Sequence, residues 1–443
     1  MPALAPPSSS LPPLPRQWRA LQWGVILLPI NPIMALLGLL WAFFSTWKIR
    51  WRQIIQTPLA WGFGILSLWL LIVTALAQYP LESLLGLPNF LPQFAVLLAF
   101  SLIIRRFAHL RFLAQGLSIT SGLLVILGFG QIYGNWSSPG WLSIIGTNLV
   151  AGGRPEGRMS SLLMYANLFS AYLIMVLPLA LALFIREMRQ SWEQENHQIS
   201  PQLFLLGCLV TGEAIALVLT DSRSAWGIGL LIFIAFALYL TWYWWVALSV
   251  ALGILILGAS FSPVGQAPLR QLVPRFLWGR LSDELYPDRY KTTFRSTQWH
   301  FAWQMMLERP IWGQGLRNFT PLYEAQMNVW LGHPHNLGLM LLGEIGIPGT
   351  LLFLGLVGLI LAAAVLLLRQ LAQFRLSAQR REQHLLLFAY LISFGGLVLY
   401  NLFDVTIFDV RINLLGWIIL AAIAGVSQRY GTIFNRGLSA GQV

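Results

Sequence analysis

Long apolar segments constrain this chain more than any other feature. A helix needs about 20 predominantly apolar residues to cross the hydrocarbon core of a bilayer. Candidate spans lie at 21–43, 60–77, 92–104, 112–132, 161–185, 203–220, 225–241, 243–261, 350–368, 385–402 and 412–427. The first contains Pro29 and Pro32, so it is either one kinked helix or a short hairpin. The expected count is therefore eleven or twelve spans.

The composition agrees with this pattern. The 443-residue chain is 57% hydrophobic, carries 10% charged residues and has a mean hydropathy of +0.67, whereas a soluble protein carries about 25% charged residues. We predict an all-α fold, a polytopic integral membrane helical bundle with a periplasmic segment containing amphipathic helices. Cys208 is the single cysteine, which excludes an intrachain disulfide and a cysteine-based zinc site. It is expected to be a small core residue.

The connections divide the chain into regions. Residues 1–20 are rich in proline and serine and lack the basic start and apolar stretch of a signal peptide, so we predict a disordered cytoplasmic tail. Transmembrane helices are expected over 21–261 and 350–427. A long periplasmic segment with interfacial helices and a His-Asn pair, 262–349, separates them. Residues 428–443 are predicted to be a cytoplasmic tail.

Basic residues orient the predicted bundle. Five basic clusters alternate with the other connections, as cytoplasmic segments do under the positive-inside rule. They are Lys48, Arg50 and Arg52; Arg105, Arg106 and Arg111; Arg186 and Arg189; Arg369, Arg375, Arg380 and Arg381; and Arg429 and Arg436. The net charge of +12 is thus a topology signal, and no nucleic-acid partner is expected. Arg16 and Arg19 favour a cytoplasmic N-terminus, which requires the hairpin alternative.

The connections on the predicted periplasmic side contain arginines that topology does not require. Arg223 lies in the short turn TDSRSAW between two spans, and Arg158 lies in the 132–160 connection. A guanidinium binds phosphate oxygens in a fork and keeps its charge at any relevant pH. Arg223 is either an anion-binding group at the mouth of a cavity or a snorkelling residue paired with Asp221.

Arg295 begins a second segment of interest. Apolar residues follow it at helical spacing: Trp299, Ala302, Trp303, Met306 and Leu307. This spacing predicts an amphipathic helix on the membrane surface that ends at Pro310 and Gly313. Taken alone, Arg295 would be a solvated residue on its polar face.

Two histidines, His333 and His335, precede the span at 350–368. We predict no metal here, because no acid or cysteine lies at ligand spacing in the sequence. A neutral imidazole accepts a proton near neutral pH, so His335 is a candidate general base. Proline and glycine at 346–349 should separate a short helix, 336–345, from the span. Glu344 would lie on the opposite face of that helix from His335, so it is expected to be structural.

Four motifs in order resemble those of the O-antigen ligase/polymerase superfamily of bacterial membrane glycosyltransferases. His335-Asn336, nine residues and Gly346-Ile347-Pro348-Gly349 match its His-Asn/Ser/Gln, nine residues, Gly-x-x-Gly ligase signature. The turn TDSRSAWG resembles its Ser-Arg-x-x-Trp element and maps Arg223. The run from Arg295 to RPIWGQG resembles its Arg-x-x-x-Trp element and the stop that follows. NLFDV, which contains Asp404, resembles a late element, and the likeness covers roughly 155–425.

The resemblance implies a glycosyltransferase of the bacterial inner membrane, active in lipopolysaccharide biosynthesis, with its site facing the periplasm. The donor would be an undecaprenyl-diphosphate-linked glycan, and the acceptor a hydroxyl of lipid A core, a polysaccharide or another molecule. The reaction would need no metal or cofactor and would be inverting. His335, Arg223 and Arg295 are the expected catalytic residues. Arg158, Asn336, His333 and Asp404 are the expected substrate-binding residues.

Other functions remain open at this level. One is an O-antigen or exopolysaccharide polymerase, which shares the donor. Another, of a different class, is a small-anion (bicarbonate-like) transporter, and a third is a purely structural membrane subunit. A transporter would be expected to contain internal repeats and helices interrupted at the midplane. The sequence has no evident internal repeat, and its arginines lie at the rim.

Overall fold

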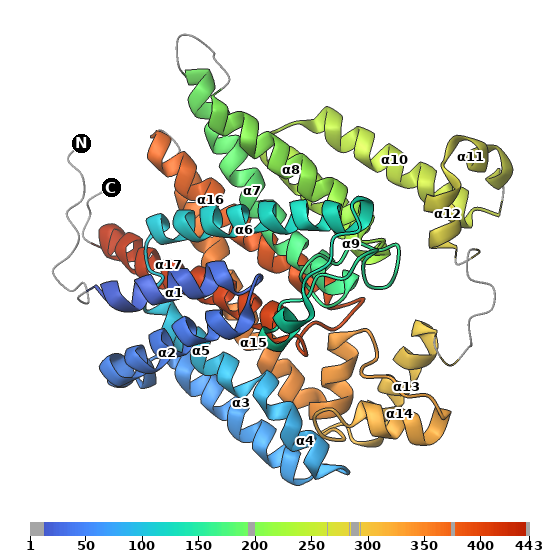
Figure 1. The fold of residues 1–443 in the computed structure, drawn as a ribbon. Helices are drawn as coiled ribbons and strands as arrows, with labels where there is room; N and C mark the ends of the chain where they lie inside the picture. The colour runs from blue at the N-terminus through green and yellow to red at the C-terminus, as the bar shows by residue number, and fades with distance from the viewer. Residues whose placement is uncertain are drawn as a thin grey trace.

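The computed structural model describes residues 13–193, 200–263, 265–282, 284, 292, 294–373 and 377–439, with backbone alone for 432–439. Among these residues it contains α-helices and two short 3-10 helices and no strand, which confirms the all-α prediction. The first part comprises α1 Pro15–Leu27, α2 Pro32–Ile55, α3 Pro58–Ala75, α4 Pro80–Gly86, η1 Leu87–Asn89, α5 Leu91–Ser101, α6 Phe107–Tyr133, η2 Gly140–Ile145, α7 Ala166–Glu193 and α8 Pro201–Leu219. The second comprises α9 Arg223–Tyr239, α10 Tyr243–Phe261, α11 Gln266–Leu272, α12 Arg275–Leu281, α13 Arg295–Glu308, α14 Phe319–Met327, α15 Leu337–Gln373, α16 Ala378–Tyr400 and α17 Val410–Ser439 (Figure 1).

The chain is a polytopic helical membrane protein. Within the described residues ten helices are long and apolar enough to cross a membrane, with α4 to α5 acting together as one of them. The 17-residue helix α9 is slightly shorter. Every predicted span coincides with one of these helices. The first span is a hairpin, because α1 and α2 are separate helices packed against each other.

Local sequence signals explain where several helices begin. Asn31, Thr57 and Ser200 each accept a hydrogen bond from the backbone N–H three residues later, and a proline follows each of them. An N-cap side chain satisfies a free N–H of the first turn, and proline at the first helical position loses no hydrogen bond. The helix α1 begins at Pro15, inside the predicted 1–20 tail, while residues 1–12 lie outside the described part. At the other end α17 runs through the predicted 428–443 tail as far as Ser439, and residues 440–443 lie outside the described part.

Two helices form the centre of the bundle. In α17 94% and in α7 83% of the most apolar stretch is buried, compared with 17% in α8 and α10. A helix that is apolar on all sides is stable only where other helices or lipid surround it. The helix α7 packs against α6, α8 and α16, and α17 packs against α5 and α15. Cys208, expected in the core, is exposed on α8.

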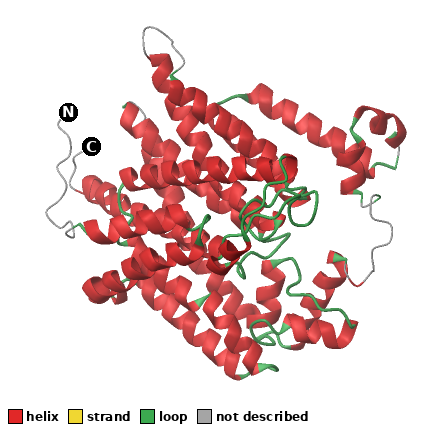
Figure 2. Cartoon of the chain, in the orientation of Figure 1, coloured by secondary structure: helices red, strands yellow, loops and turns green. Residues whose placement is uncertain are grey.

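The described basic clusters and the longest loops lie at opposite ends of the bundle. Arg111 and Arg186 both pair with Glu382, at 3.1 and 3.2 Å. Burial lowers the pKa of Arg105, and the nearby charges of Arg429 and Arg50 lower it further. The long loops gather at the other end (Figure 2). We call this second end the loop end, defined by the described residues 134–165, 220–222, 262–263, 265–282, 294–336 and 401–409.

A break in α15 shapes the loop end. Gly346 has φ +72° and ψ 175°, so the helix is interrupted there, as predicted for a separate short helix over 336–345. A Cβ at this position would lie 2.0 Å from the carbonyl oxygen of Ile311, so only glycine fits. The N–H groups of Gln314 and Gly315 donate to the carbonyls of Gly343 and Glu344, each at 2.9 Å. These bonds satisfy carbonyls that the break leaves without helical partners.

The helix after Arg295 exists as predicted and packs on the first half of α15. Its residues Phe301, Ala302 and Met305 are buried, and Phe301 contacts Phe319 and Tyr323 of α14. Two residues of the predicted membrane-facing stripe, Trp303 and Leu307, remain exposed. The helices α13, α14 and the first half of α15 therefore form a small subdomain beside the bundle (Figure 1).

Candidate functional site

Two loops bring a histidine and an aspartate together at the loop end. His335 lies just before α15, and Asp404 lies in the loop after α16. The backbone N–H of Leu337 donates to the carbonyl of Asn401 at 2.7 Å, which ties the two loops to each other. His335 has φ +51°, a conformation that costs energy for a residue with a side chain and is held in place by these contacts.

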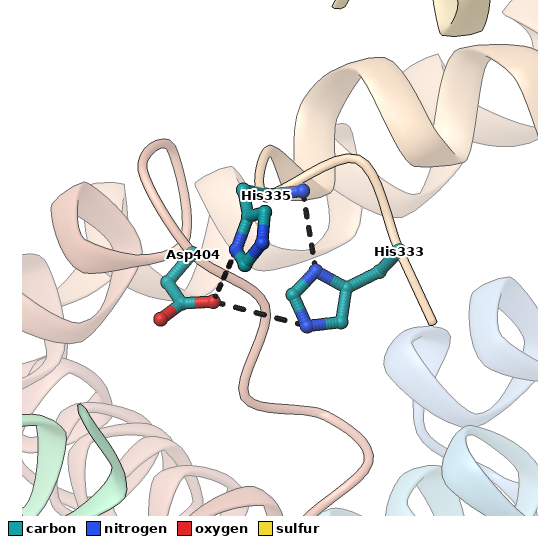
Figure 3. A group of neighbouring side chains, drawn as sticks. All are labelled: His333, His335 and Asp404. Carbon is teal, nitrogen blue, oxygen red and sulfur yellow. Dashed lines mark hydrogen bonds and ion pairs between the residues drawn. The ribbon is translucent and has the colours of Figure 1, made fainter. Parts of the chain in front are cut away.

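His335 and Asp404 form a direct pair. The Nδ1 of His335 lies 2.9 Å from Oδ1 of Asp404 (Figure 3). Because Nδ1 donates its proton to the carboxylate, Nε2 is left with a lone pair that can accept one. Burial alone would raise the pKa of Asp404, but the hydrogen bond from His335, the charges of both histidines and the N–H of Val405 bring it down to about 2. Asp404 is therefore a buried anion at neutral pH.

His333 completes the cluster. Its Nδ1 accepts the backbone N–H of His335 at 3.2 Å, and its Nε2 lies 3.8 Å from Oδ1 of Asp404 (Figure 3). The ring stacks on Phe408, with ring centres 6.0 Å apart. Burial lowers the pKa of His333 to about 4; Asp404 opposes this shift, and the charges of His335 and Arg295 add to it. Arg295 of α13 thus lies within electrostatic reach of the cluster.

A chain of hydrogen bonds extends from Asp404 to Arg158. Asn167, near the start of α7, donates from Nδ2 to Oδ2 of Asp404 at 2.8 Å. Arg158 donates from Nη2 to Oδ1 of Asn167 at 2.6 Å and from Nε to the carbonyl of Thr220 at 2.8 Å. Asn167 thus links α7 to the loop after α16. Arg158, Asn167, Asp404 and His335 therefore form one continuous hydrogen-bonded network.

Arg223 lies at the start of α9, three residues after Thr220. Its Nη1 donates to the backbone carbonyl of Arg280 at 2.8 Å. The Nη2 of Arg280 in turn bonds to Oδ2 of Asp221 at 2.8 Å and to the Asp221 carbonyl at 3.1 Å. The ion-pair partner of Asp221 is therefore Arg280, whereas the snorkelling alternative paired Asp221 with Arg223. These contacts fasten α12 to the turn between α8 and α9.

Asn336 has a local structural contact. Its Oδ1 accepts the N–H of Leu339 at 2.9 Å, which is an N-cap bond for α15. Glu344 is buried and lies near the N–H of Phe319, in keeping with its expected structural role. Sequence reasoning missed Arg280 and Phe408. No motif distinguishes Arg280 from the other arginines of the 262–294 region, although an acid alone in a tight turn, Asp221, indicates that some cation must approach it.

A comparison with known protein families matches part of this region. Residues 204–354 match the model of a family described as O-antigen ligase. The match runs from α8 to just beyond the break in α15, so it contains Arg223, Arg295 and the His335–Gly349 segment, while Arg158 and Asp404 lie outside it. None of the curated proteins matches the chain.

Proposed function

Since the chain is a member of the O-antigen ligase superfamily through residues 204–354, we propose that it transfers a glycan from undecaprenyl diphosphate to an acceptor hydroxyl on the periplasmic side of the bacterial inner membrane. The observation that carries this proposal is the His335–Asp404 pair, which leaves Nε2 of His335 available as a base. Three arginines, Arg158, Arg223 and Arg295, lie around the same end of the bundle. A base beside several fixed cations suits an acceptor hydroxyl and a diphosphate leaving group.

His335 is the proposed general base. Its Nε2 takes the proton of the acceptor hydroxyl as that oxygen attacks the anomeric carbon of the donor sugar. The bond from this carbon to the diphosphate oxygen breaks, and the diphosphate leaves with the electron pair. Direct attack from the opposite side inverts the anomeric centre. Asp404 holds the imidazole in the correct tautomer and stabilises the imidazolium, because it is an anion hydrogen-bonded to Nδ1.

The arginines are the proposed diphosphate site. Arg223 and Arg295 would neutralise the charge that develops on the leaving group, and loss of one such contact costs roughly 2–4 kcal/mol, on the order of a hundredfold in rate. Arg158 already uses Nε and Nη2 within the protein, so its Nη1 is the atom that phosphate binding would use. Its contacts also suit the positioning of Asn167 and Asp404. The loop-end location fits a lipid-linked donor, whose head group lies at the membrane surface.

The test is transfer by the purified protein. We would supply an undecaprenyl-diphosphate-linked oligosaccharide with lipid A core, glycan and water as alternative acceptors, in detergent with EDTA. His335→Gln is expected to reduce transfer by about 10²–10⁴-fold, the usual contribution of a general base. His300→Gln is the matched control, because His300 is an exposed histidine on α13 outside the network. Transfer that survives His335→Gln would refute the base assignment, and the acceptor used would distinguish a ligase from a polymerase.

A further inference from the structure

We propose that His333, His335 and Asp404 form a binding site for a first-row transition metal ion of the Zn²⁺ type, and that the bound ion switches off glycan transfer. The binding site stands on the geometry alone. The effect on transfer rests on the proposed function, since it requires that His335 act as a base. The ion is therefore an inhibitor of the reaction and has no part in its chemistry.

The donor atoms are close to the arrangement that zinc requires. Oδ1 of Asp404 lies 2.9 Å from Nδ1 of His335 and 3.8 Å from Nε2 of His333. One donor atom from each of the three residues lies within 4.8 Å of the other two (Figure 3). A tetrahedral Zn²⁺ with bonds of about 2.0–2.2 Å separates neighbouring ligand atoms by about 3.3 Å. The two observed separations lie on either side of this value, so small side-chain rotations would suffice.

The surroundings already hold the ligands in place. Asn167 bonds to Oδ2 of Asp404, and the N–H of Val405 bonds to Oδ1, so the carboxylate has a fixed orientation. Phe408 stacks on the ring of His333. Outer contacts of this kind orient metal ligands and strengthen binding. Asp404 is 7% exposed, so a bound ion would be partly shielded from water.

The third ligand, Asp404, could not be identified as a ligand from the sequence pattern. His333 and His335 alone are a weak metal motif, and no acid follows them at ligand spacing. Asp404 is separated from His335 by 69 positions and reaches it only through the contact of two loops. Two imidazoles and one carboxylate form a ligand set that suits Zn²⁺, with water in the fourth position.

Metal binding and base catalysis exclude each other at His335. A neutral imidazole that binds a metal through Nδ1 carries its proton on Nε2, so Nε2 can no longer accept the proton of the acceptor hydroxyl. His333 binds through Nε2 by moving its own proton to Nδ1, which breaks the 3.2 Å bond from the N–H of His335. Each proton changes nitrogen through solvent. Both imidazoles stay neutral and Asp404 stays a carboxylate, so no proton is gained or lost.

A binding experiment tests the site without any need for transfer activity. The full chain in detergent would be stripped of metal with EDTA, exchanged into metal-free buffer and titrated with Co²⁺, which gives a visible absorption band in tetrahedral sites. Zn²⁺ would then be added as a competitor. We expect one Co²⁺ per chain, and a weakening of about 10–100-fold or more in His333→Ala and Asp404→Asn. His300→Ala is the control and should bind like the wild type.

An inhibition experiment tests the switch. Transfer would be measured against Zn²⁺ concentration, with each variant scaled to its own rate in EDTA. The wild type should lose transfer as the site fills and regain it with EDTA, and His333→Ala should need at least tenfold more Zn²⁺. Co²⁺ binding that is absent, or that is equal in His333→Ala and wild type, would overturn the site. Binding with no change in rate would overturn the switch alone. Failure of transfer in every condition would count against the proposed function and leave the binding result to decide the site.

Discussion

Asp404 contacts three other residues of the candidate site. It bonds to His335 through Oδ1 and to Asn167 through Oδ2, and His333 lies 3.8 Å away. These contacts keep the pKa of Asp404 near 2 despite burial, so its charge persists at every pH suitable for an assay. A buried carboxylate held by hydrogen bonds fixes the orientation of its histidine partner.

Asp404→Asn is predicted to retain the fold and lose most transfer. The asparagine amide can accept a hydrogen bond from Nδ1 of His335 through its oxygen or donate one to Nδ1 through its nitrogen. It therefore no longer selects the tautomer with Nε2 free, and it does not stabilise the imidazolium. We expect kcat to fall by about 10²–10⁴-fold with a smaller change in KM for the donor. The measurement is steady-state transfer by Asp404→Asn and by the wild type, with thermal unfolding of both proteins measured to check that the variant keeps the fold. Because the folded pKa of Asp404 lies near 2, the wild-type rate should not respond to its protonation above about pH 4.

Asn167→Ala provides the graded comparison. It removes the bond to Oδ2 of Asp404 and one partner of Arg158 while leaving His335 and Asp404 intact. A charge-assisted hydrogen bond contributes about 1.5–3 kcal/mol, so a loss of roughly 10–100-fold in kcat/KM is expected. Asn167→Asp should be worse still, because it would bring a second carboxylate beside Asp404. Equal activity of Asn167→Ala and wild type would remove Asn167 and Arg158 from the working network.

At the scale of elements, α12 and the turn between α8 and α9 act as one unit. The Arg280 side chain forms an ion pair with Asp221, and the Arg280 carbonyl accepts a hydrogen bond from Arg223. Asp221 has φ +51°, so the turn itself is held in an uncommon conformation. The direction of Arg223 therefore depends on a helix that begins more than fifty residues later, Arg275–Leu281.

Arg280→Ala is predicted to weaken donor use. Without its ion pair, α12 loosens from the turn and its carbonyl no longer fixes Arg223, although Arg223 itself remains. We expect kcat/KM for the donor to fall by roughly 5–30-fold, corresponding to about 1–2 kcal/mol, mainly through KM. Arg275→Ala is the control, an exposed arginine on the same helix. Arg280→Lys should recover part of the loss, and the idea fails if Arg280→Ala and Arg275→Ala behave alike.

Gly346→Ala is predicted to destabilise the loop end. The new Cβ would lie 2.0 Å from the Ile311 carbonyl oxygen at a φ of +72°, so the break in α15 and the 310–315 segment could not keep their mutual hydrogen bonds. Strain of this kind costs about 1–3 kcal/mol before the clash is added. Gly355→Ala is the control on the same helix, with open space around the added Cβ. Thermal unfolding in detergent should be lowered by several degrees in Gly346→Ala only.

At the scale of the whole molecule, the bundle has two chemically different ends. One end carries the basic clusters, where Arg111 and Arg186 both pair with Glu382. The candidate site occupies the other end. A multi-pass protein with clusters of basic residues at one end is expected to keep that end in the cytoplasm, so the loop end is the proposed periplasmic face.

Cysteine labelling in intact cells tests this orientation. Cys208 would first be replaced by serine, and single cysteines introduced by Ser137→Cys at the loop end and Thr241→Cys at the opposite end, both at exposed positions. A membrane-impermeant maleimide added to cells with a permeabilised outer membrane should label the Ser137→Cys protein alone. Lysis should make both proteins reactive. Labelling of only the Thr241→Cys protein would reverse the topology and exclude a periplasmic site.

Hydropathy and local backbone chemistry determined the spans and the break at Gly346, because each depends on residues adjacent in the chain, and they left a kinked helix or a hairpin open for the first span. They also identified His335 as a candidate. Only the tertiary structure decided that Asp404 orients His335 and that Asp221 pairs with Arg280 in place of Arg223. These partners lie far apart in sequence, and which of several similar side chains meet depends on how whole helices pack. The sequence shows which residue types are available for a site, and the packing of the helices determines which of them become partners.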